Sequence, residues 1–425
     1  MEPSIFISAG EASGEHYGAL LIEQLQNLLK SYGRPPSSFF GMGGPRMRAS
    51  GLECIVPAEA MAVMGITEVI RHLPRIYRGF RRLRQSIREY RPSVAVLIDF
   101  PDIHFKLAKE LHRLGIPVVF FVSPQLWAWK KHRIRLVQRY ISRMLVIFPF
   151  EEPFYRQRDV QAEFVGHPLA ELPLPAITRE DFARQNSLDP ASTWIGLLPG
   201  SRAKEIRANL PEMLKATLGL VERNRSTRFQ FLIPLAATLN PRQQNAVQSM
   251  VNDLAAGAGV RLVQDARAAL FHARASVVAS GTATVEAALI GNPFVVVYRV
   301  SPLTYAIAKR VVTVPHVAMA NLIAGKRMVP ELIQDDCKAG NIIVELERLL
   351  PDGLPRQSMK MELARIPGLL LSGGAEKAAG PGSIGRVAQV TLELMKNPSA
   401  AEWEEAVQSR INGDVFRMDN KWQQK

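Results

Sequence analysis

Short apolar runs, each followed by a small-residue turn and a helix-like segment, recur along this chain and restrict its fold more than any other feature. They occur in both halves, at residues 4–9, 94–98, 117–122, 195–198, 276–279 and 294–298. Strands that alternate with amphipathic helices form parallel sheets covered by helices on both faces. The series restarts near residue 195 after a proline-rich break, and 425 residues exceed one ordinary domain. We predict an α/β fold of two Rossmann-like domains, residues 1–170 and 171–396, with ligands in the cleft between them and a polar tail at 397–425.

The composition is that of a globular protein, with 47% hydrophobic residues. The only two cysteines, Cys54 and Cys337, lie far apart and have no histidine cluster nearby, which argues against a disulfide framework or a zinc site. The first residues lack a basic region followed by a long apolar run, and no stretch approaches the roughly 20 apolar residues of a spanning helix. We expect a cytoplasmic protein, soluble or peripheral to a membrane.

The formal charge of +14 is unevenly distributed, since residues 66–91 hold eight arginines and two glutamates. Apolar residues recur there at helical spacing, and Pro74 should kink or divide the helix. An ordinary surface helix would show this pattern. Alternatively, its first part presents apolar groups to a membrane while arginines meet lipid phosphates. Nucleic acid ranks below these partners because the segment lacks a stacking platform. The membrane hypothesis rests on Ile66, Val69, Ile70, Leu73, Arg71 and Arg75.

Two strand–turn–helix junctions in the second half offer anion sites, because a helix N-terminus leaves backbone N–H groups free. At the first junction, Ser201 and Arg202 follow a Pro-Gly turn, and the planar guanidinium suits phosphate oxygens. The second junction has the sequence Ser280, Gly281, Thr282. One turn further, Glu286 could accept two ribose hydroxyls, although the helix dipole also favours an acid at this position.

The first half carries a glycine- and serine-rich loop after its first strand, with Ser13, Gly14 and Glu15. Its glycines are spaced by four, which does not match G-x-G-x-x-G, so we expect no nicotinamide cofactor. The loop lies at the sheet edge where ligands bind, or it is only a tight turn. Asp99 and Asp102 follow the strand at 94–98. Asp102 is a plausible helix N-cap, so Asp99 is the better candidate for acid–base chemistry.

Several stretches together resemble the lipid-A-disaccharide synthase family. They follow the family order from about residue 4 to 395 and read SAGEASGE, MAVMGITEV, DFPD, VSPQLWAW, FVGHPLA, LLPGSR, ASGTATVEAAL and NLIAGKRMVPELIQ. The resemblance implies an inverting glycosyltransferase of GT-B architecture in lipid A and lipopolysaccharide biosynthesis. Such an enzyme joins UDP-2,3-diacylglucosamine to 2,3-diacylglucosamine 1-phosphate (lipid X), giving the β-1,6-linked disaccharide and UDP. It would work peripherally at the inner face of the inner membrane of a Gram-negative bacterium, with a homodimer left open.

The resemblance also implies roles for single residues. Asp99, or alternatively Glu15, would take the proton of the acceptor hydroxyl, with Ser13 and Gly14 in the acceptor loop. Glu15 stands where the family usually has aspartate, and Ala320 where proline often precedes the NLIAG motif. The nucleotide-sugar would be bound by Ser201, Arg202, Ser280, Gly281, Thr282, Glu286 and Asn321.

No D-x-D triplet occurs in the chain, so a metal-chelated diphosphate is unsupported and we expect no metal. We also expect no cofactor. Two other readings remain open at this point. One is a UDP-sugar 2-epimerase of the same architecture. The other is a non-catalytic basic module that binds nucleic acid or a membrane, but the order of the family stretches argues strongly against it, and we expect no nucleic-acid partner.

Overall fold

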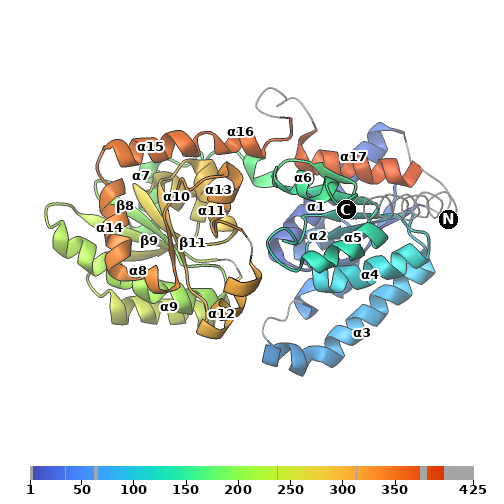
Figure 1. The fold of residues 1–425 in the computed structure, drawn as a ribbon, viewed down its shortest axis with the longest axis horizontal. Helices are drawn as coiled ribbons and strands as arrows, with labels where there is room; N and C mark the ends of the chain where they lie inside the picture. Colours follow the sequence, from blue (N-terminus) through green and yellow to red (C-terminus); the bar gives the residue numbers. More distant parts are fainter. Residues whose placement is uncertain are drawn as a thin grey trace, which may run out of the picture. The chain divides into compact units, whose positions relative to one another are not determined.

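The computed structural model describes residues 3–33, 35–61, 66–236, 238–312, 314–373 and 381–396; the predicted polar tail lies outside these ranges. The chain divides into two compact units, one formed by Met1–Pro168 with Leu371–Lys425 and the other by Leu169–Leu370. Each unit contains one parallel sheet with helices on both faces (Figure 1).

The first unit is built on a seven-stranded sheet of order β3-β2-β1-β4-β5-β6-β7. All of its strand pairs are parallel. The strands are β1 (Ser4–Ala9), β2 (Ser38–Gly43), β3 (Leu52–Pro57), β4 (Val94–Ile98), β5 (Val118–Phe121), β6 (Arg143–Val146) and β7 (Ala162–Phe164).

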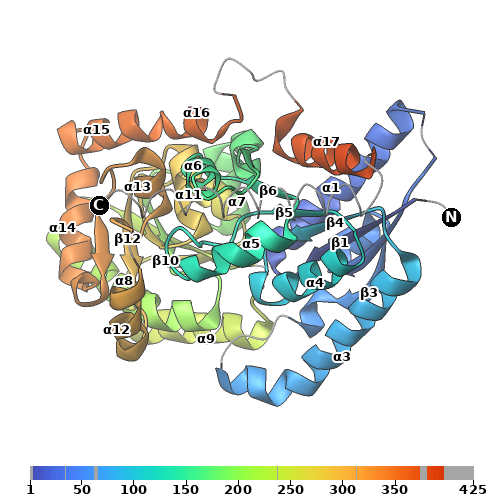
Figure 2. The same cartoon turned by 45° about the vertical axis from the view of Figure 1, so that its right-hand side comes forward.

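Helices cover both faces of this sheet because successive strand residues point to opposite sides. Ile5 and Ile7 pack with α1 and α17, whereas Phe6 packs with α3 and α4. Figure 2 shows α17 and the α3–α4 pair on opposite sides of the sheet. The helices are α1 (Ala12–Ser31), α2 (Pro45–Ala49), α3 (Ile66–Tyr90), α4 (Pro101–Arg113), α5 (Ile134–Tyr140), α6 (Glu151–Arg156) and α17 (Gly382–Lys396), with 3-10 turns η1 (Ala58–Ala60) and η2 (Lys131–Arg133).

The second unit has a six-stranded parallel sheet of order β10-β9-β8-β11-β12-β13. Its strands are β8 (Thr193–Leu198), β9 (Phe229–Pro234), β10 (Val260–Val263), β11 (Ala275–Ala279), β12 (Phe294–Tyr298) and β13 (Glu331–Ile333). Its helices are α7 (Arg179–Asn186), α8 (Ala203–Arg223), α9 (Pro241–Leu254), α10 (Ala266–His272), α11 (Thr282–Ile290), α12 (Pro302–Val311), α13 (Met319–Ala324), α14 (Ala339–Leu349), α15 (Leu354–Leu363) and α16 (Ile366–Leu370), with 3-10 turns η3 (Pro168–Glu171), at the junction of the units, and η4 (Gln334–Asp336).

Each sheet has a point where the strand order reverses, and ligands of open α/β sheets bind at the carboxyl ends of the strands there. In the first unit the reversal lies between β1 and β4, and in the second between β8 and β11. The predicted site segments follow these four strands. Residues 10–15 and 99–102 share one sheet edge, and residues 199–202 and 280–282 share the other.

The predicted strands are confirmed to within two residues at each end, but the domain limits differ from the prediction. We predicted that residues 171–396 form one domain, whereas α17 belongs to the first unit. The reason is packing, since Ile384, Val387 and Ala388 lie in the same core cluster as Leu21 and Leu25 of α1. In addition, α3 runs through Pro74 as one helix and is not divided there. Among the described residues, no helix is both long and apolar enough to cross a membrane.

Candidate active site

Asp99 lies at the carboxyl end of β4 in a tight strand-to-helix turn. Asp99 and Phe100 both have left-handed φ angles, 52° and 53°, which non-glycine residues rarely adopt. The Asp99 amide donates to the carbonyl of Phe121 in β5 at 2.9 Å, and α4 begins two residues later. The Phe100 ring packs on Gly10, where a Cβ would come within 2.4 Å of Phe100 Cγ. The turn therefore places the half-buried Asp99 at the ligand-binding edge of the sheet.

Glu15, the alternative base, has a structural partner. Its Oε1 accepts hydrogen bonds from the backbone amides of Arg46 at 2.6 Å and Met47 at 3.3 Å. These amides belong to the first turn of α2, so the Glu15 carboxylate caps that helix. Nearby, Ser13 is exposed, whereas Gly14 is buried against Ile98 and an added Cβ would lie 3.4 Å from Ile98 Cγ2.

Asp102 is not the N-cap that the sequence suggested. The N-cap position of α4 is Phe100, which makes no side-chain cap bond, and Asp102 lies inside the first turn. Its exposed carboxylate forms an ion pair of 2.6 Å with Arg133.

In the second unit, the turn from β8 to α8 already holds an anion from its own chain. Glu205 Oε2 accepts from the backbone amides of Ser201 at 3.1 Å and Arg202 at 3.4 Å, and Glu205 Oε1 contacts Arg202 Nη1 at 3.1 Å. Gly200 makes room for this contact with φ of +121°, and an added Cβ there would clash with Glu205. The donors predicted for a phosphate thus face a carboxylate in this structure.

The buried Asn209 anchors this turn. Asn209 Nδ2 donates to the Pro199 carbonyl at 3.1 Å, and Asn209 Oδ1 accepts from the Arg299 amide at 3.0 Å. Asn209 thereby ties the end of β8 to the end of β12. Tyr298 lies beside the turn, where burial and the Glu205 carboxylate raise the pKa of its hydroxyl.

The second loop, Ser280-Gly281-Thr282, leads into α11 beside the first. Ser280 Oγ donates to the Val317 carbonyl at 3.0 Å, while Gly281 and Thr282 are exposed. Gly281 has φ of +148° with open space where a Cβ would point. Two helix N-termini therefore follow neighbouring strands, because β8 and β11 pair directly.

Glu286 lies one turn into α11 and is half-buried. Burial raises the pKa of its carboxyl, against the influence of the nearby Arg267. Within the described part of the chain, no side-chain or backbone donor forms a hydrogen bond with this carboxylate. A half-buried acceptor of this kind suits a ligand that brings hydroxyl donors.

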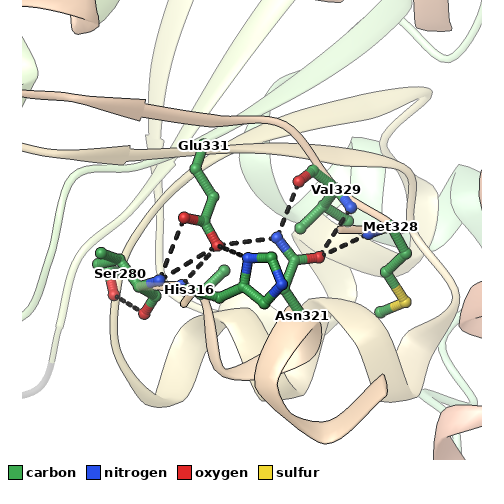
Figure 3. A network of polar contacts seen from close by, with 8 residues as sticks. Ser280, His316, Asn321, Met328, Val329 and Glu331 are labelled. Atoms are coloured by element: carbon green, nitrogen blue, oxygen red, sulfur yellow. Dashed lines mark hydrogen bonds and ion pairs between the residues drawn. The ribbon is translucent and has the colours of Figure 1, made fainter. Parts of the chain in front are cut away.

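Asn321 is fully buried, with 0% of its surface exposed. Its Nδ2 donates to the Val329 carbonyl and to Glu331 Oε1, and its Oδ1 accepts from the amides of Met328 and Val329, all within 2.8–3.0 Å (Figure 3). The prediction that Asn321 contacts the nucleotide is therefore not supported, because every polar group of the side chain is already bonded within the protein.

Glu331 is the centre of this network, and sequence reasoning missed it. Its carboxylate accepts from the amides of Val317 and Ala318 at the start of α13, at 3.0–3.2 Å, and lies 3.9 Å from His316 Nδ1 (Figure 3). Because the Val317 carbonyl also accepts from Ser280, the network reaches the loop before α11.

Comparisons with known proteins agree with this arrangement. A family model described as lipid-A-disaccharide synthetase matches residues 5–367. A lipid-A-disaccharide synthase from Acidobacterium capsulatum is 57% identical over 407 residues, which cover 94% of this chain and 98% of the relative. The chain belongs to the lipid-A-disaccharide synthase family. A second member, from Koribacter versatilis, is 48% identical over 375 residues, covering 88% and 95% of the two chains. The prediction of a glycosyltransferase of lipid A biosynthesis is confirmed.

Solved structures share the fold at low sequence identity. The calicheamicin glycosyltransferase CalG4 has a TM-score of 0.56 at 18% identity, covering 94% of this chain and 99% of that one. MurG from Acinetobacter baumannii has a TM-score of 0.53 at 15% identity, covering 92% and 100%. A UDP-GlcNAc 2-epimerase from Neisseria meningitidis, solved with UDP-GlcNAc, reaches 0.58 at 15% identity, covering 93% and 100%. The predicted GT-B fold is confirmed, and the epimerase alternative is supported by the fold alone.

The membrane hypothesis for this member of the lipid-A-disaccharide synthase family cannot be compared with the structure at most of its residues, because their side chains are not described. The backbone of α3 includes Ile66, Val69, Ile70, Arg71 and Leu73, but these side chains lie outside what the structure describes. Arg75 is exposed. Further along α3, Leu83 and Ile87 are buried in the core, as expected of an ordinary surface helix.

Metal binding has no candidate among the described residues, where no group of three histidine, cysteine, aspartate or glutamate side chains comes together. Metal independence of this lipid-A-disaccharide synthase family member stays a prediction.

Proposed function

We propose that this protein transfers the 2,3-diacylglucosamine unit of UDP-2,3-diacylglucosamine to the 6-hydroxyl of 2,3-diacylglucosamine 1-phosphate (lipid X). In a single displacement, a base removes the hydroxyl proton while the oxygen attacks the anomeric carbon. The bond from that carbon to the diphosphate breaks, and its electron pair leaves with UDP. This sequence inverts the anomeric centre and gives the β-1,6-linked disaccharide 1-phosphate.

The two turns that follow β8 and β11 support the proposed binding of the UDP-sugar donor. The N-termini of α8 and α11 follow adjacent strands, and Arg202 adds a guanidinium to the first of them. The Ser201 and Arg202 amides, which bind Glu205 in this structure, would turn from that carboxylate to the diphosphate when the donor binds. Fixed N–H dipoles and an arginine stabilise the charge that develops on a leaving diphosphate. Glu286, with no donor of its own among the described residues, would accept the ribose hydroxyls. Asn321 would act through Glu331 and the Ser280 loop instead of touching the nucleotide.

Asp99 is the base that we propose for the acceptor hydroxyl. It is half-buried at the β1–β4 edge, in a turn with a left-handed backbone. Glu15, which caps α2, would stabilise the conformation of the acceptor loop that contains Ser13 and Gly14.

The decisive experiment supplies the purified chain with UDP-2,3-diacylglucosamine and lipid X. We expect equal amounts of UDP and disaccharide. Asp99→Asn should lower turnover by at least about a hundredfold, as expected for loss of a general base, and should leave UDP affinity unchanged. Asp102→Asn is the matched control and should turn over normally, since the exposed Asp102 carboxylate pairs with Arg133 on the surface. Conversion of the donor alone, without disaccharide, would contradict the proposal.

We also propose that the first part of α3 docks on the cytoplasmic face of the inner membrane, where acylated substrates reside. Apolar residues with interleaved arginines suit an anionic lipid surface. Changing Ile66, Val69 and Ile70 together to serine should release the protein from phosphatidylglycerol vesicles in a sedimentation assay. If the variant still sediments with the vesicles as the parent chain does, the docking hypothesis is wrong.

A further inference from the structure

We propose that His104 is a positioning residue that fixes the peptide of Asp99 and thereby the direction in which the Asp99 side chain leaves the backbone. This inference rests on the proposed function, in which Asp99 is the base. It concerns a residue that the sequence did not single out.

The turn at Asp99 needs external support because two consecutive non-glycine residues are left-handed. Phe100 has φ of 53° and ψ of 55°, and Asp99 has φ of 52°. Such conformations are strained for residues with a Cβ and persist only when their surroundings fix them. The direction of the Asp99 side chain follows from this backbone geometry, so whatever fixes the peptide also aims the carboxylate.

His104 supplies that support through hydrogen bonds on both ring nitrogens. Its Nδ1 bonds to the carbonyl oxygen of Asp99, and its Nε2 lies 2.8 Å from Ser8 Oγ in β1. A carbonyl only accepts, so Nδ1 must carry the proton and Nε2 must accept from the Ser8 hydroxyl. The His104 backbone amide also donates to the Phe100 carbonyl at 3.2 Å. One residue therefore binds both carbonyls of the left-handed pair.

The surroundings keep the ring neutral and immobile. His104 and Ser8 are both 0% exposed. The imidazole packs edge-on against Phe100 and Phe120, with centroids 5.8 and 6.1 Å away. Burial lowers the pKa of His104 to about 4, so the single-proton form prevails at neutral pH.

Ser8, His104 and Asp99 superficially match the residues of a hydrolytic triad, but the geometry excludes that role. His104 bonds to the backbone carbonyl of Asp99 and not to its carboxylate. Ser8 is buried within β1, where no substrate can reach its hydroxyl. The three residues instead form a chain of hydrogen bonds that links β1, through His104 in α4, to the turn after β4.

The test compares His104→Leu, His104→Asn and Phe105→Leu in the disaccharide assay. Leucine fills the space but cannot donate, so kcat should fall about a hundredfold, the usual effect of misplacing a catalytic group by about 1 Å, with UDP affinity unchanged. Asparagine places a donor near the position of Nδ1 and should restore most of the rate. Phe105→Leu, a core change in the same helix, controls for stability and should keep kcat despite a lower Tm.

Two outcomes would overturn this role: a kcat for His104→Leu within twofold of the parent, or a loss no greater than that of Phe105→Leu at matched Tm. A crystal structure of His104→Leu, or of His104→Met if that variant folds better, provides a test that needs no activity, because both variants lack the Nδ1 donor. We expect the φ angles of Asp99 and Phe100 to leave the left-handed region, and unchanged angles would refute the proposal. A parent chain that makes no disaccharide would contradict the proposed function, while these angles would still decide the structural claim.

Discussion

Among single residues, Arg202 has the clearest expected effect on catalysis. Arg202→Ala removes a guanidinium beside the proposed diphosphate, and loss of one such donor lowers kcat by about a hundredfold to a thousandfold. Arg202→Lys should recover only part of the rate, because a lysine cannot form the planar two-point contact. Arg207→Ala, at an exposed position on the same helix, is the control. Turnover of Arg202→Ala equal to that of Arg207→Ala would remove Arg202 from the diphosphate site.

The sequence located the polar residues of the site better than it assigned their roles. Ser201 and Arg202 lie at a helix N-terminus as predicted, but nothing in the pattern indicated that Glu205 already bonds to their amides. Asn321 was predicted to face a ligand, yet it is buried against Glu331. Partners that come from another strand or turn depend on tertiary packing, which periodicity and spacing do not encode.

At the scale of elements, α13 and the loop before α11 depend on the Asn321–Glu331 network. Asn321→Ala deletes four hydrogen bonds and leaves buried partners unsatisfied. Each such group costs about 1–3 kcal/mol. We expect a marked drop in Tm together with weaker UDP binding, since the Ser280 loop is tied to the same network. Asn341→Ala, which removes an exposed hydrogen bond, should have little effect on either.

This prediction separates a positioning role from direct contact. Thermal unfolding and UDP titration of the Asn321→Ala variant give the two readouts. A variant that keeps the parent Tm but loses UDP binding would show that Asn321 touches the nucleotide after all. Asn321→Asp should be worse than alanine, because a second carboxylate would then face Glu331 at a distance now spanned by a 2.8 Å hydrogen bond.

Continuously apolar strands were predictable from the sequence, and strands interrupted by polar residues were not. The apolar runs of β1, β4 and β12 give continuous buried strands, as parallel sheets require. By contrast, β3, β7 and β13 escaped prediction because each is an edge strand with charged residues in or beside its apolar positions. The return of α17 to the first unit also left no local signal, since its amphipathic face fits either sheet and only its packing on α1 selects one.

For the molecule as a whole, we expect stability to depend on pH through three buried groups of the first unit. Burial lowers the pKa of His104 and of His167 to about 4, from an ordinary value of 6.5. Between these values the unfolded chain binds two protons that the folded chain does not, so both histidines stabilise the fold above pH 6.5 and cease to do so as the pH falls towards 4. Each contributes about 1.4 kcal/mol per pH unit in that window.

Glu151 acts in the opposite direction. Its carboxylate accepts from Trp127 Nε1 and the Phe148 amide, both at 3.0 Å, and burial raises its pKa to about 7 from an ordinary value of 4.5. Between pH 4.5 and 7 the folded chain keeps a proton that the unfolded chain releases. Glu151 therefore stabilises the fold at low pH and loses this contribution as the pH rises. The pH-dependent contribution of Glu151 to stability therefore roughly cancels that of one of the two histidines.

Replacing Glu151 by glutamine should therefore steepen the pH dependence of Tm. The side chain then stays neutral, only the two histidine contributions remain, and the difference in Tm between Glu151→Gln and the parent should become more positive from pH 4.5 to 7. A constant offset from altered hydrogen bonds does not affect this slope, and surface carboxylates cancel because both proteins carry them. The His167→Asn variant should change the slope the other way. A Tm difference that stays flat across this range would mean that Glu151 is ionised in the folded protein and that its bonds to Trp127 and Phe148 outweigh the effect of burial.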